Sequence, residues 1–330
     1  MISIKTKSTN PYFNLALEEY ALKYLDIEDI IVILWQNEPT VVVGRNQNTI
    51  EEVNSKYIKD NNINVVRRLS GGGAVYHDLG NLNFTFIVKN ASNSVSNFKK
   101  FTKPVIKALN QLNIPAVFSG RNDITIEEKK FSGNAQYYYR NKLLHHGTIL
   151  FNSDLSVVQN ALNVKLDKIQ SKGIKSVRSR VTNIYPYLEK KISTEEFKDL
   201  LLSFLFEQEN QEQKEYILTD DDLEKIDTMM KERYLTWEWN YGQSPNFDMQ
   251  KSKRYEGGNL DIRLNVEKGF ISDLKIFGDF FGRNEISELE TLLKNSKYEE
   301  NSIREKLKSI DLTTYLYNVS EDDFIDCLFY

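Results

Sequence analysis

The segment RRLSGGGAVYHD, residues 67–78, follows the apolar run INVV of residues 63–66 and places three consecutive glycines between two arginines and a His-Asp pair. Glycines lack a Cβ, so they adopt positive φ and let backbone N–H groups converge, as an anion-binding loop requires. Arg68 adds a fixed positive charge suited to phosphate or carboxylate. A flexible hairpin turn is the alternative for any Gly-Gly-Gly sequence. The flanking AVYHD favours a ligand with an apolar body and an ionised end.

This glycine segment matches neither of the two common nucleotide-binding patterns. The P-loop pattern GxxxxGK[ST] is absent from the chain, and the third residue after Gly73 is Tyr76, where a dinucleotide fingerprint has glycine. A nucleotide that binds here is therefore bound in another way.

Composition narrows the class of protein. A length of 330 residues suits one large domain or two unequal ones. With 27% charged residues, 40% apolar residues and a net charge of −4, the chain is ordinary for a globular protein, and nucleic acid is not expected as a partner. No signal peptide and no apolar run of about 20 residues is found, so we expect a cytoplasmic protein without a membrane partner. A single cysteine, Cys327, excludes an intramolecular disulfide.

Periodicity predicts a mixture of helices and strands. A helix is expected over residues 14–24, with Ser8, Thr9 or Asn10 as its cap and Pro11 in its first turn. The runs IIVILWQ and TVVVGRNQN predict two strands joined by a tight turn at residues 37–39. Further expected elements are a helix over 50–61, strands over 63–68 and 82–89, a helix over 97–112, and strands over 123–127, 131–140 and 142–151. The last three strands suggest an antiparallel meander, so the predicted fold class is α+β with a mixed or antiparallel sheet.

The C-terminal part of the chain predicts a second, smaller domain. Helical patterns occupy residues 194–208 and 220–234, and WEWNYGQSPNF at 237–247 has no clear periodicity. We expect a catalytic domain over 1–243, a linker and hinge over 244–249, and a small α+β domain over 250–330. In that domain a strand-rich stretch, 255–281, precedes two helical patterns.

Four blocks in this order resemble the lipoate-protein ligase A family: RRLSGGGAVYHDLGN, GRNDITIEEKKFSGNAQ, HHGTILFNSDL and KGIKSVRSRVTN. The similarity runs from about residue 10 to 241, and WEWNYGQSPNF resembles the end of that family's catalytic domain. The resemblance implies a catalytic domain folded like biotin ligases and class II aminoacyl-tRNA synthetases, with a C-terminal accessory domain. It also implies ATP-dependent activation of lipoate or octanoate to an acyl-adenylate, pyrophosphate release, and transfer of the acyl group to a lysine of an acceptor domain.

The family motif places a lysine directly before [FVI]SG, and the matching residue is Lys130 in KFSGNA. A compact ammonium group can contact a carboxylate oxygen and the α-phosphate together, so the resemblance implies that Lys130 is catalytic. Without the motif, Lys130 is a solvated hairpin lysine and Arg45 a surface arginine at a strand end. Residues implied for ATP or the adenylate are Arg45, Arg68, Gly73, Ala74, Val75, Tyr76, Asn122, Asp123, Lys130 and Asn183. Residues implied for lipoate are Gly71, Gly72, Gly73, His77, Lys130 and His146. Asp123 is the expected Mg²⁺ ligand.

The expected ligands are ATP with Mg²⁺ and lipoate as substrate, with no tightly bound prosthetic group. The expected partners are apo lipoyl domains of 2-oxoacid dehydrogenase E2 subunits, the glycine-cleavage H protein, or both. One alternative is an ATP-independent octanoyl or lipoyl transferase, for which Cys327 is misplaced as a thioester-forming residue. A biotin ligase is disfavoured because the glycine segment differs from that family's loop. A lipoate-binding protein without turnover is the non-enzymatic alternative.

Overall fold

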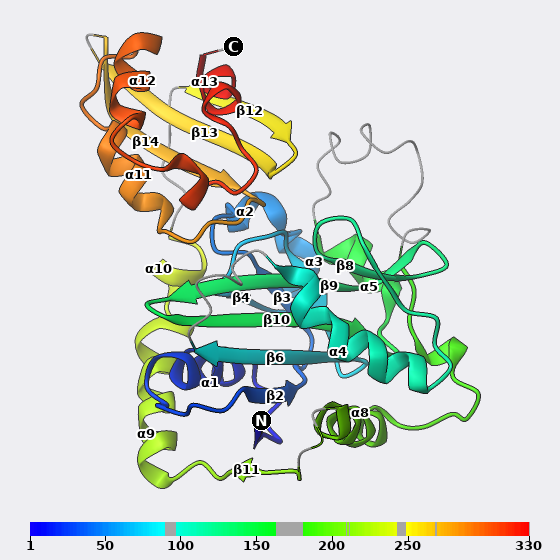
Figure 1. The fold of residues 1–330 in the computed structure, drawn as a ribbon. Helices are drawn as coiled ribbons and strands as arrows, with labels where there is room; N and C mark the ends of the chain where they lie inside the picture. Colours follow the sequence, from blue (N-terminus) through cyan, green and yellow to red (C-terminus); the bar gives the residue numbers. More distant parts are fainter. Residues whose placement is uncertain are drawn as a thin grey trace.

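A computed structural model describes residues 1–89, 97–162, 181–208, 210, 212–242, 249–267 and 269–329. These residues form a large domain of sheets covered by helices and a smaller C-terminal domain above it (Figure 1). The predicted α+β class is confirmed. Among the helices of these residues, none has the length and apolar character needed to cross a membrane.

The main sheet of the large domain is mixed, and eight strands of the described residues belong to it. In sheet order they are β11 (Glu215–Tyr216), β1 (Ile2–Lys5), β2 (Ile31–Trp35), β6 (Asn81–Lys89), β10 (Lys142–Leu150), β9 (Lys129–Tyr139), β8 (Asp123–Ile126) and β7 (Val117–Ser119). β1 pairs in parallel with β2 and β11. From β6 through β10, β9 and β8 to β7, each strand pairs antiparallel with the next in this order. The predicted meander of three strands is confirmed as β8, β9 and β10.

A second sheet carries the glycine segment. Its central strand β3 (Thr40–Val43) pairs in parallel with β4 (Asn64–Arg67) and antiparallel with β5 (Val75–His77). The glycine segment is the connection from β4 to β5. The two strands predicted around the turn at 37–39 are confirmed as β2 and β3. They do not pair with each other, because β2 lies between β1 and β6 in the main sheet.

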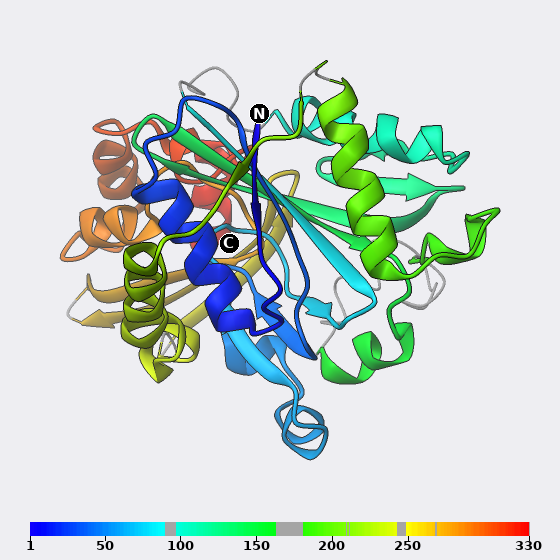
Figure 2. The same cartoon turned by 90° about the horizontal axis from the view of Figure 1, so that it is seen from below.

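Helices cover both faces of the main sheet. α1 (Pro11–Lys23), α9 (Asp220–Met229) and the π-helical turn η3 (Met230–Tyr234) pack on the face that carries Ile31, Ile33 and Trp35. α4 (Phe98–Gln111) and α8 (Thr194–Gln208) pack on the face that carries Val32 and Leu34. Figure 2 shows α1 and α9 together on one side of the sheet and α8 on the other. Both faces of β2 are therefore buried, which explains its uninterrupted apolar sequence.

Helix caps follow the sequence closely in α1 and α4. Asn10 caps α1, its Oδ1 accepting the backbone N–H of Tyr12 and Phe13, and Pro11 is the first helical residue. The helix predicted over 97–112 is α4, whose cap is Asn97. Three short helical segments connect other elements of the domain: α5 (Leu155–Ala161), η2 (Tyr185–Tyr187) and α10 (Trp237–Asn240).

One predicted helix is wrong in its extent. Instead of a single helix over 50–61 the chain forms α2 (Thr49–Glu52) and α3 (Ser55–Asp60). The break occurs because Val53 is extended and forms a bridge with Leu162, and because Asn54 caps α3 by accepting the N–H of Tyr57. Long-range pairing thus overrides local helical periodicity here.

The C-terminal domain is an antiparallel sheet of β12 (Met249–Tyr255), β13 (Gly258–Glu267) and β14 (Phe270–Gly278), packed against helices. In its described residues these helices are α11 (Ile286–Leu293), α12 (Glu300–Leu307), the 3₁₀ turn η4 (Leu312–Thr314) and α13 (Glu321–Phe329). The sequence predicted two helical patterns, and α13 is a third. Cys327 is buried in this domain's core. The predicted linker 244–249 lies outside the described residues except for Met249, which begins β12.

Candidate active site

A cavity of about 140 Å³ lies where the glycine segment, α1 and strands β9 and β10 meet. Apolar side chains form part of its wall: Leu15, Trp35, Val42 and Val75. Polar side chains from the meander form another part: Asn122, Lys130, Asn134 and Thr148. The cavity thus has the composition expected for a ligand with an apolar body and a charged group.

Close packing fixes the glycine segment at one side of this cavity. Gly72 has φ of +90°, a conformation that glycine adopts without strain. A Cβ on Gly44 of the neighbouring strand end would lie 1.9 Å from the carbonyl oxygen of Gly72. By contrast, a Cβ on Gly73 would meet no atom of the described residues within 4 Å. The backbone of Gly73 is therefore open to a ligand, whereas that of Gly72 packs closely against Gly44.

Arg68 lines the cavity and also holds the glycine segment in shape. Its guanidinium donates hydrogen bonds to the carbonyl oxygens of Gly71 (2.7 Å), Gly73 (2.9 Å) and Val42 (3.2 Å). Burial lowers the pKa of Arg68 to about 10, which leaves it charged at neutral pH. These contacts give Arg68 a structural role that the sequence did not reveal.

Lys130 lies on β9 at the cavity wall and forms an ion pair with Asp123 of β8. Its Nζ is 2.7 Å from Asp123 Oδ1, and each side chain is about one-third exposed, at 39% and 34%. Lys129, its neighbour, is exposed and lies outside the cavity lining among the described residues. A Cβ on Gly133 would lie 3.0 Å from Lys130 Nζ, so this glycine leaves room for the amine. The pair is accessible to a ligand that enters the cavity.

Asn122 and Asn134 brace the strands beside Lys130. The side-chain amide of Asn122 donates to the Asn134 carbonyl at 2.6 Å, and the Asn134 amide donates to the Asn122 carbonyl at 3.0 Å. Both residues line the cavity. Sequence reasoning identified Asn122 and missed Asn134, its partner on the next strand.

Two histidines predicted for lipoate binding also line the cavity. His146 Nδ1 lies 3.1 Å from both Glu18 carboxylate oxygens, and its Nε2 lies 2.6 Å from Ser70 Oγ. Sequence reasoning missed Glu18 and Ser70. The signal for Glu18 was present, since a carboxylate between Leu15 and Leu22 lies on the apolar face of the predicted helix.

His77 presents an unsatisfied polar atom at the cavity. Its Nδ1 is 3.1 Å from the Asn37 amide nitrogen, which only donates, so Nδ1 accepts and Nε2 carries the proton. Within the described residues this Nε2 is buried and has no hydrogen-bond partner. Burial, followed by the charge of Arg68, lowers the pKa of His77 to about 3, so the ring is neutral. It is therefore a donor available to a ligand.

Other predicted residues lie beside the cavity rather than in its lining. Gly71 packs against Phe280, away from the cavity. Tyr76 of β5 is buried in an apolar cluster that includes residues of β3. Asn183 binds the backbone of Ser153, accepting its N–H at 3.0 Å and donating to its carbonyl at 2.9 Å. Arg45 pairs with Glu285 of the C-terminal domain, with Nη2 2.5 Å from Oε2. The remaining predicted residues, Gly72, Gly73, Ala74 and Val75, line the cavity with those above.

No group of three or more His, Cys, Asp or Glu side chains suited to a metal occurs in the part of the chain that the structure describes. Asp123 supplies a single carboxylate, which pairs with Lys130 and lies next to the cavity lining rather than in it. Most of the block KGIKSVRSRVTN, through residue 180, lies outside the described residues.

Comparison with protein families assigns both domains. Residues 10–206 match the lipoyl protein ligase A/B catalytic domain, and residues 244–328 match the bacterial lipoate protein ligase C-terminus. The chain is 50% identical to the lipoate-protein ligase LplJ of Bacillus subtilis, over 100% of both chains. It is 46% identical to lipoate–protein ligase 1 of Staphylococcus aureus, over 96% of each.

Solved structures show the same similarity. Plasmodium falciparum LipL1 in complex with lipoate superposes with a TM-score of 0.80 at 28% identity, over 98% of this chain and 97% of that one. A lipoate-protein ligase A bound with ATP gives 0.63 at 27% identity, over 74% and 98%. A bipartite archaeal ligase from Thermoplasma acidophilum, studied with its E2 lipoyl domain, gives 0.66 at 28% identity, over 75% and 98%.

The fold, the cavity and these matches define a two-domain enzyme of the acyl-ligating class. The chain belongs to the lipoyl protein ligase A/B family, with the C-terminal domain of its bacterial members. It is a lipoate-protein ligase.

Proposed function

We propose that this enzyme activates lipoate with ATP in the cavity beside Lys130 and then transfers the lipoyl group to a lysine of an acceptor lipoyl domain. The observation that carries the proposal is the accessible Lys130–Asp123 pair, 2.7 Å apart, at a cavity bounded by apolar residues and by the glycine segment. The similar structures with bound lipoate and with bound ATP support the same ligands.

In the first step a lipoate carboxylate oxygen bonds to the α-phosphorus of ATP. The bond from that phosphorus to the bridging oxygen breaks, and pyrophosphate leaves. Because two anions must meet, a cation between them lowers the barrier, and the Lys130 ammonium suits this position. In the second step the acceptor lysine amine bonds to the acyl carbon, loses a proton and displaces AMP.

The residues divide between the two ligands by chemistry. Gly73 offers open backbone to the nucleotide, Ala74 and Val75 line the cavity beside it, and Arg68 supplies positive charge next to this segment. His77 Nε2, an unpaired donor among the described residues, suits a lipoate atom. Tyr76, Asn122 and Asn183 would act by positioning strands and turns, and Arg45 would bind phosphate once released from Glu285. Gly72 and His146, which line the cavity, complete the proposed lipoate site, and Gly71 would support it from behind the lining.

Mg²⁺ in nucleotide sites is usually held by one or two carboxylates together with phosphate oxygens. Asp123 fits such a role, because its carboxylate pairs with Lys130, which lines the cavity. The ion would neutralise phosphate charge while Lys130 bridges to the carboxylate.

The proposed acceptors are lipoyl domains of E2 subunits and the glycine-cleavage H protein, and the proposed site of action is the cytoplasm. The archaeal relative studied with its E2 lipoyl domain supports the first of these. A thioester route through Cys327 is disfavoured, because burial raises the pKa of this thiol to about 12.

The test follows pyrophosphate release from Mg-ATP with lipoate or octanoate, for the wild type, Lys130→Ala and Lys129→Ala. Lys129→Ala is the matched control, because this exposed neighbour lies outside the cavity lining. We expect pyrophosphate release that requires lipoate or octanoate. Lys130→Ala should lower its rate at least a hundredfold, and Lys129→Ala should leave the rate within about twofold of the wild type. Absence of release from the wild type with either acid would refute the proposal. Mass spectrometry of E2 domains and H protein then identifies the acceptor.

A further inference from the structure

We propose that Phe281, a side chain of the C-terminal domain, is a positioning residue that holds the glycine segment of the catalytic domain in its ligand-binding shape. The inference rests on the proposed adenylation in this cavity. It assigns to the accessory domain a specific contact with residues that line the cavity.

Phe280 and Phe281 follow β14 and contact the glycine segment directly. The carbonyl oxygen of Phe280 accepts the N–H of Gly72 at 3.4 Å and would lie 2.4 Å from a Cβ on Gly71. The ring of Phe281 would lie 3.2 Å from a Cβ on Gly72. These distances leave no room for a side chain between the two domains, so the contact requires glycine at both positions.

The same ring also contacts the elements that carry Lys130 and its neighbours. Phe281 packs with Ala135 of β9, which lines the cavity, and with Phe98, at 5.3 Å between ring centroids. The Arg121 guanidinium lies 4.6 Å from the ring centroid, and Arg121 precedes Asn122 and Asp123. Although Phe281 lies at a domain boundary, only 5% of it is exposed. One aromatic ring therefore fixes the glycine segment relative to β9.

Three consecutive glycines have wide backbone freedom, so an ordered cradle requires contacts from outside the segment. Arg68 supplies them from within the catalytic domain through the carbonyls of Gly71 and Gly73. Phe281 supplies a further contact from the C-terminal domain. A loop pre-organised in this way loses less entropy when it binds phosphate, and a displacement of about 1 Å at a reacting group can cost about 100-fold in rate.

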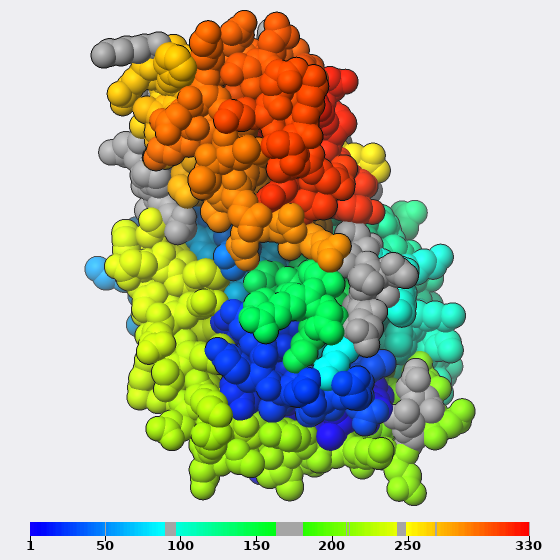
Figure 3. All heavy atoms as spheres, turned by 60° about the vertical axis from the view of Figure 1, so that its left-hand side comes forward, coloured from blue at the N-terminus to red at the C-terminus, as the bar shows by residue number. Residues whose placement is uncertain are grey.

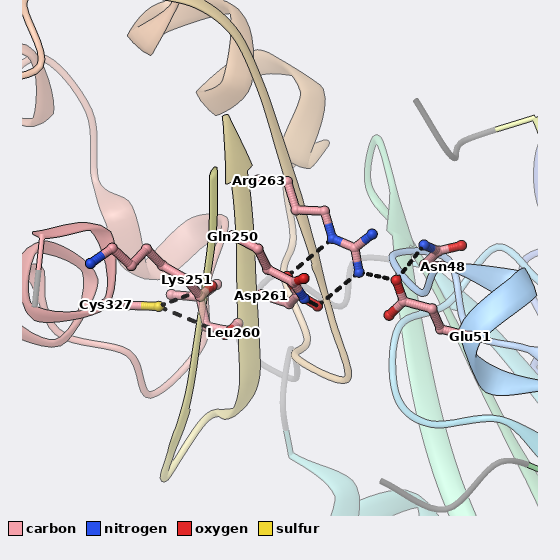
Figure 4. A network of polar contacts seen from close by, with 8 residues as sticks. All are labelled: Asn48, Glu51, Gln250, Lys251, Leu260, Asp261, Arg263 and Cys327. Carbon is pink, nitrogen blue, oxygen red and sulfur yellow. Dashed lines mark hydrogen bonds and ion pairs between the residues drawn. The ribbon is translucent and has the colours of Figure 1, made fainter. Parts of the chain in front are cut away.

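A separate interdomain contact provides the control for domain docking. Arg263 of β13 bonds both to Asp261 in its own domain and to Glu51 of α2 in the catalytic domain (Figure 4). Arg263 and Glu51 lie outside the lining of the ligand cavity among the described residues. Figure 3 shows atoms of the C-terminal domain lying directly against the catalytic domain. Glu51→Ala therefore weakens docking without removing a contact of the glycine segment.

The experiment compares the wild type with Phe281→Ala, Phe281→Leu and Glu51→Ala. Steady-state pyrophosphate release gives kcat and KM for ATP, and hydrogen–deuterium exchange reports on the peptide that contains residues 71–73. We expect Phe281→Ala to lower kcat/KM for ATP at least tenfold and to accelerate exchange in that peptide. Phe281→Leu keeps apolar volume without the planar ring. Its kcat/KM for ATP and its exchange rate are expected to lie between those of the wild type and Phe281→Ala. Glu51→Ala is expected to keep kcat/KM for ATP within about twofold of the wild-type value.

Equal losses in Phe281→Ala and Glu51→Ala would overturn the inference, because docking alone would then explain them. The inference would also be overturned if Phe281→Ala had the same kinetics and the same exchange rates as the wild type. If Phe281→Ala does not fold, the same criteria apply to Phe281→Leu. If the wild type releases no pyrophosphate, the proposed function fails, whereas the exchange comparison still tests the positioning role.

Discussion

Gly73→Ala separates ligand binding from folding, because no atom of the described residues occupies the space beside Gly73. A Cβ there meets no atom of the described residues within 4 Å, and Gly73 is not among the glycines with positive φ. The free energy of unfolding should therefore change by less than about 0.5 kcal/mol, as for an unstrained substitution away from other groups. A nucleotide that approaches this backbone would, by contrast, meet the new methyl group.

A methyl carbon keeps phosphate oxygens roughly 1 Å further from the backbone than a hydrogen bond does, and such a displacement costs about 10- to 100-fold. We expect kcat/KM for ATP to fall by that factor, equivalent to about 1.4 to 2.7 kcal/mol. Thermal unfolding and pyrophosphate release measure the two quantities. Gly44→Ala is the contrasting variant, since its Cβ would lie 1.9 Å from the Gly72 carbonyl, and it should lose stability. Unchanged ATP kinetics in Gly73→Ala would refute the placement of the nucleotide.

Two further predictions concern charges. Glu285→Gln removes the carboxylate that pairs with Arg45 at 2.5 Å, and KM for ATP should fall about two- to fivefold, as expected for a partly exposed ion pair; an unchanged KM would exclude competition between Glu285 and phosphate for Arg45. Burial lowers the pKa of His77 to about 3 and that of His145 well below 6.5, so both are neutral when folded. The unfolded chain takes up these protons first, so stability present above pH 6.5 is lost as pH falls below it, at about 1.4 kcal/mol per pH unit for each histidine that stays neutral in the folded state. For His77 this loss continues towards its folded pKa of about 3. Urea unfolding from pH 7 to pH 4.5 measures the slope, and a flat profile would contradict the assignment of two neutral histidines.

The sequence predicted most elements because their signals are local. Asn10 and Pro11 mark the start of α1, and alternating apolar residues mark the strands of the meander. It failed at residues 50–61, where the bridge between Val53 and Leu162 divides the helix. That pairing joins residues more than 100 positions apart, and no local pattern encodes it.

The candidate site shows the same division. Lys130 and the glycine segment were identified from ordered motifs, whose spacing is a property of the chain itself. The sequence alone also determined the α+β class and the resemblance to lipoate-protein ligases. Only the tertiary structure decided that Arg68 holds carbonyls of its own loop and that Phe281 covers that loop from another domain. The reason is physical: periodicity and motifs report neighbours along the chain, whereas hydrogen-bond partners and packing depend on which distant segments the fold brings together.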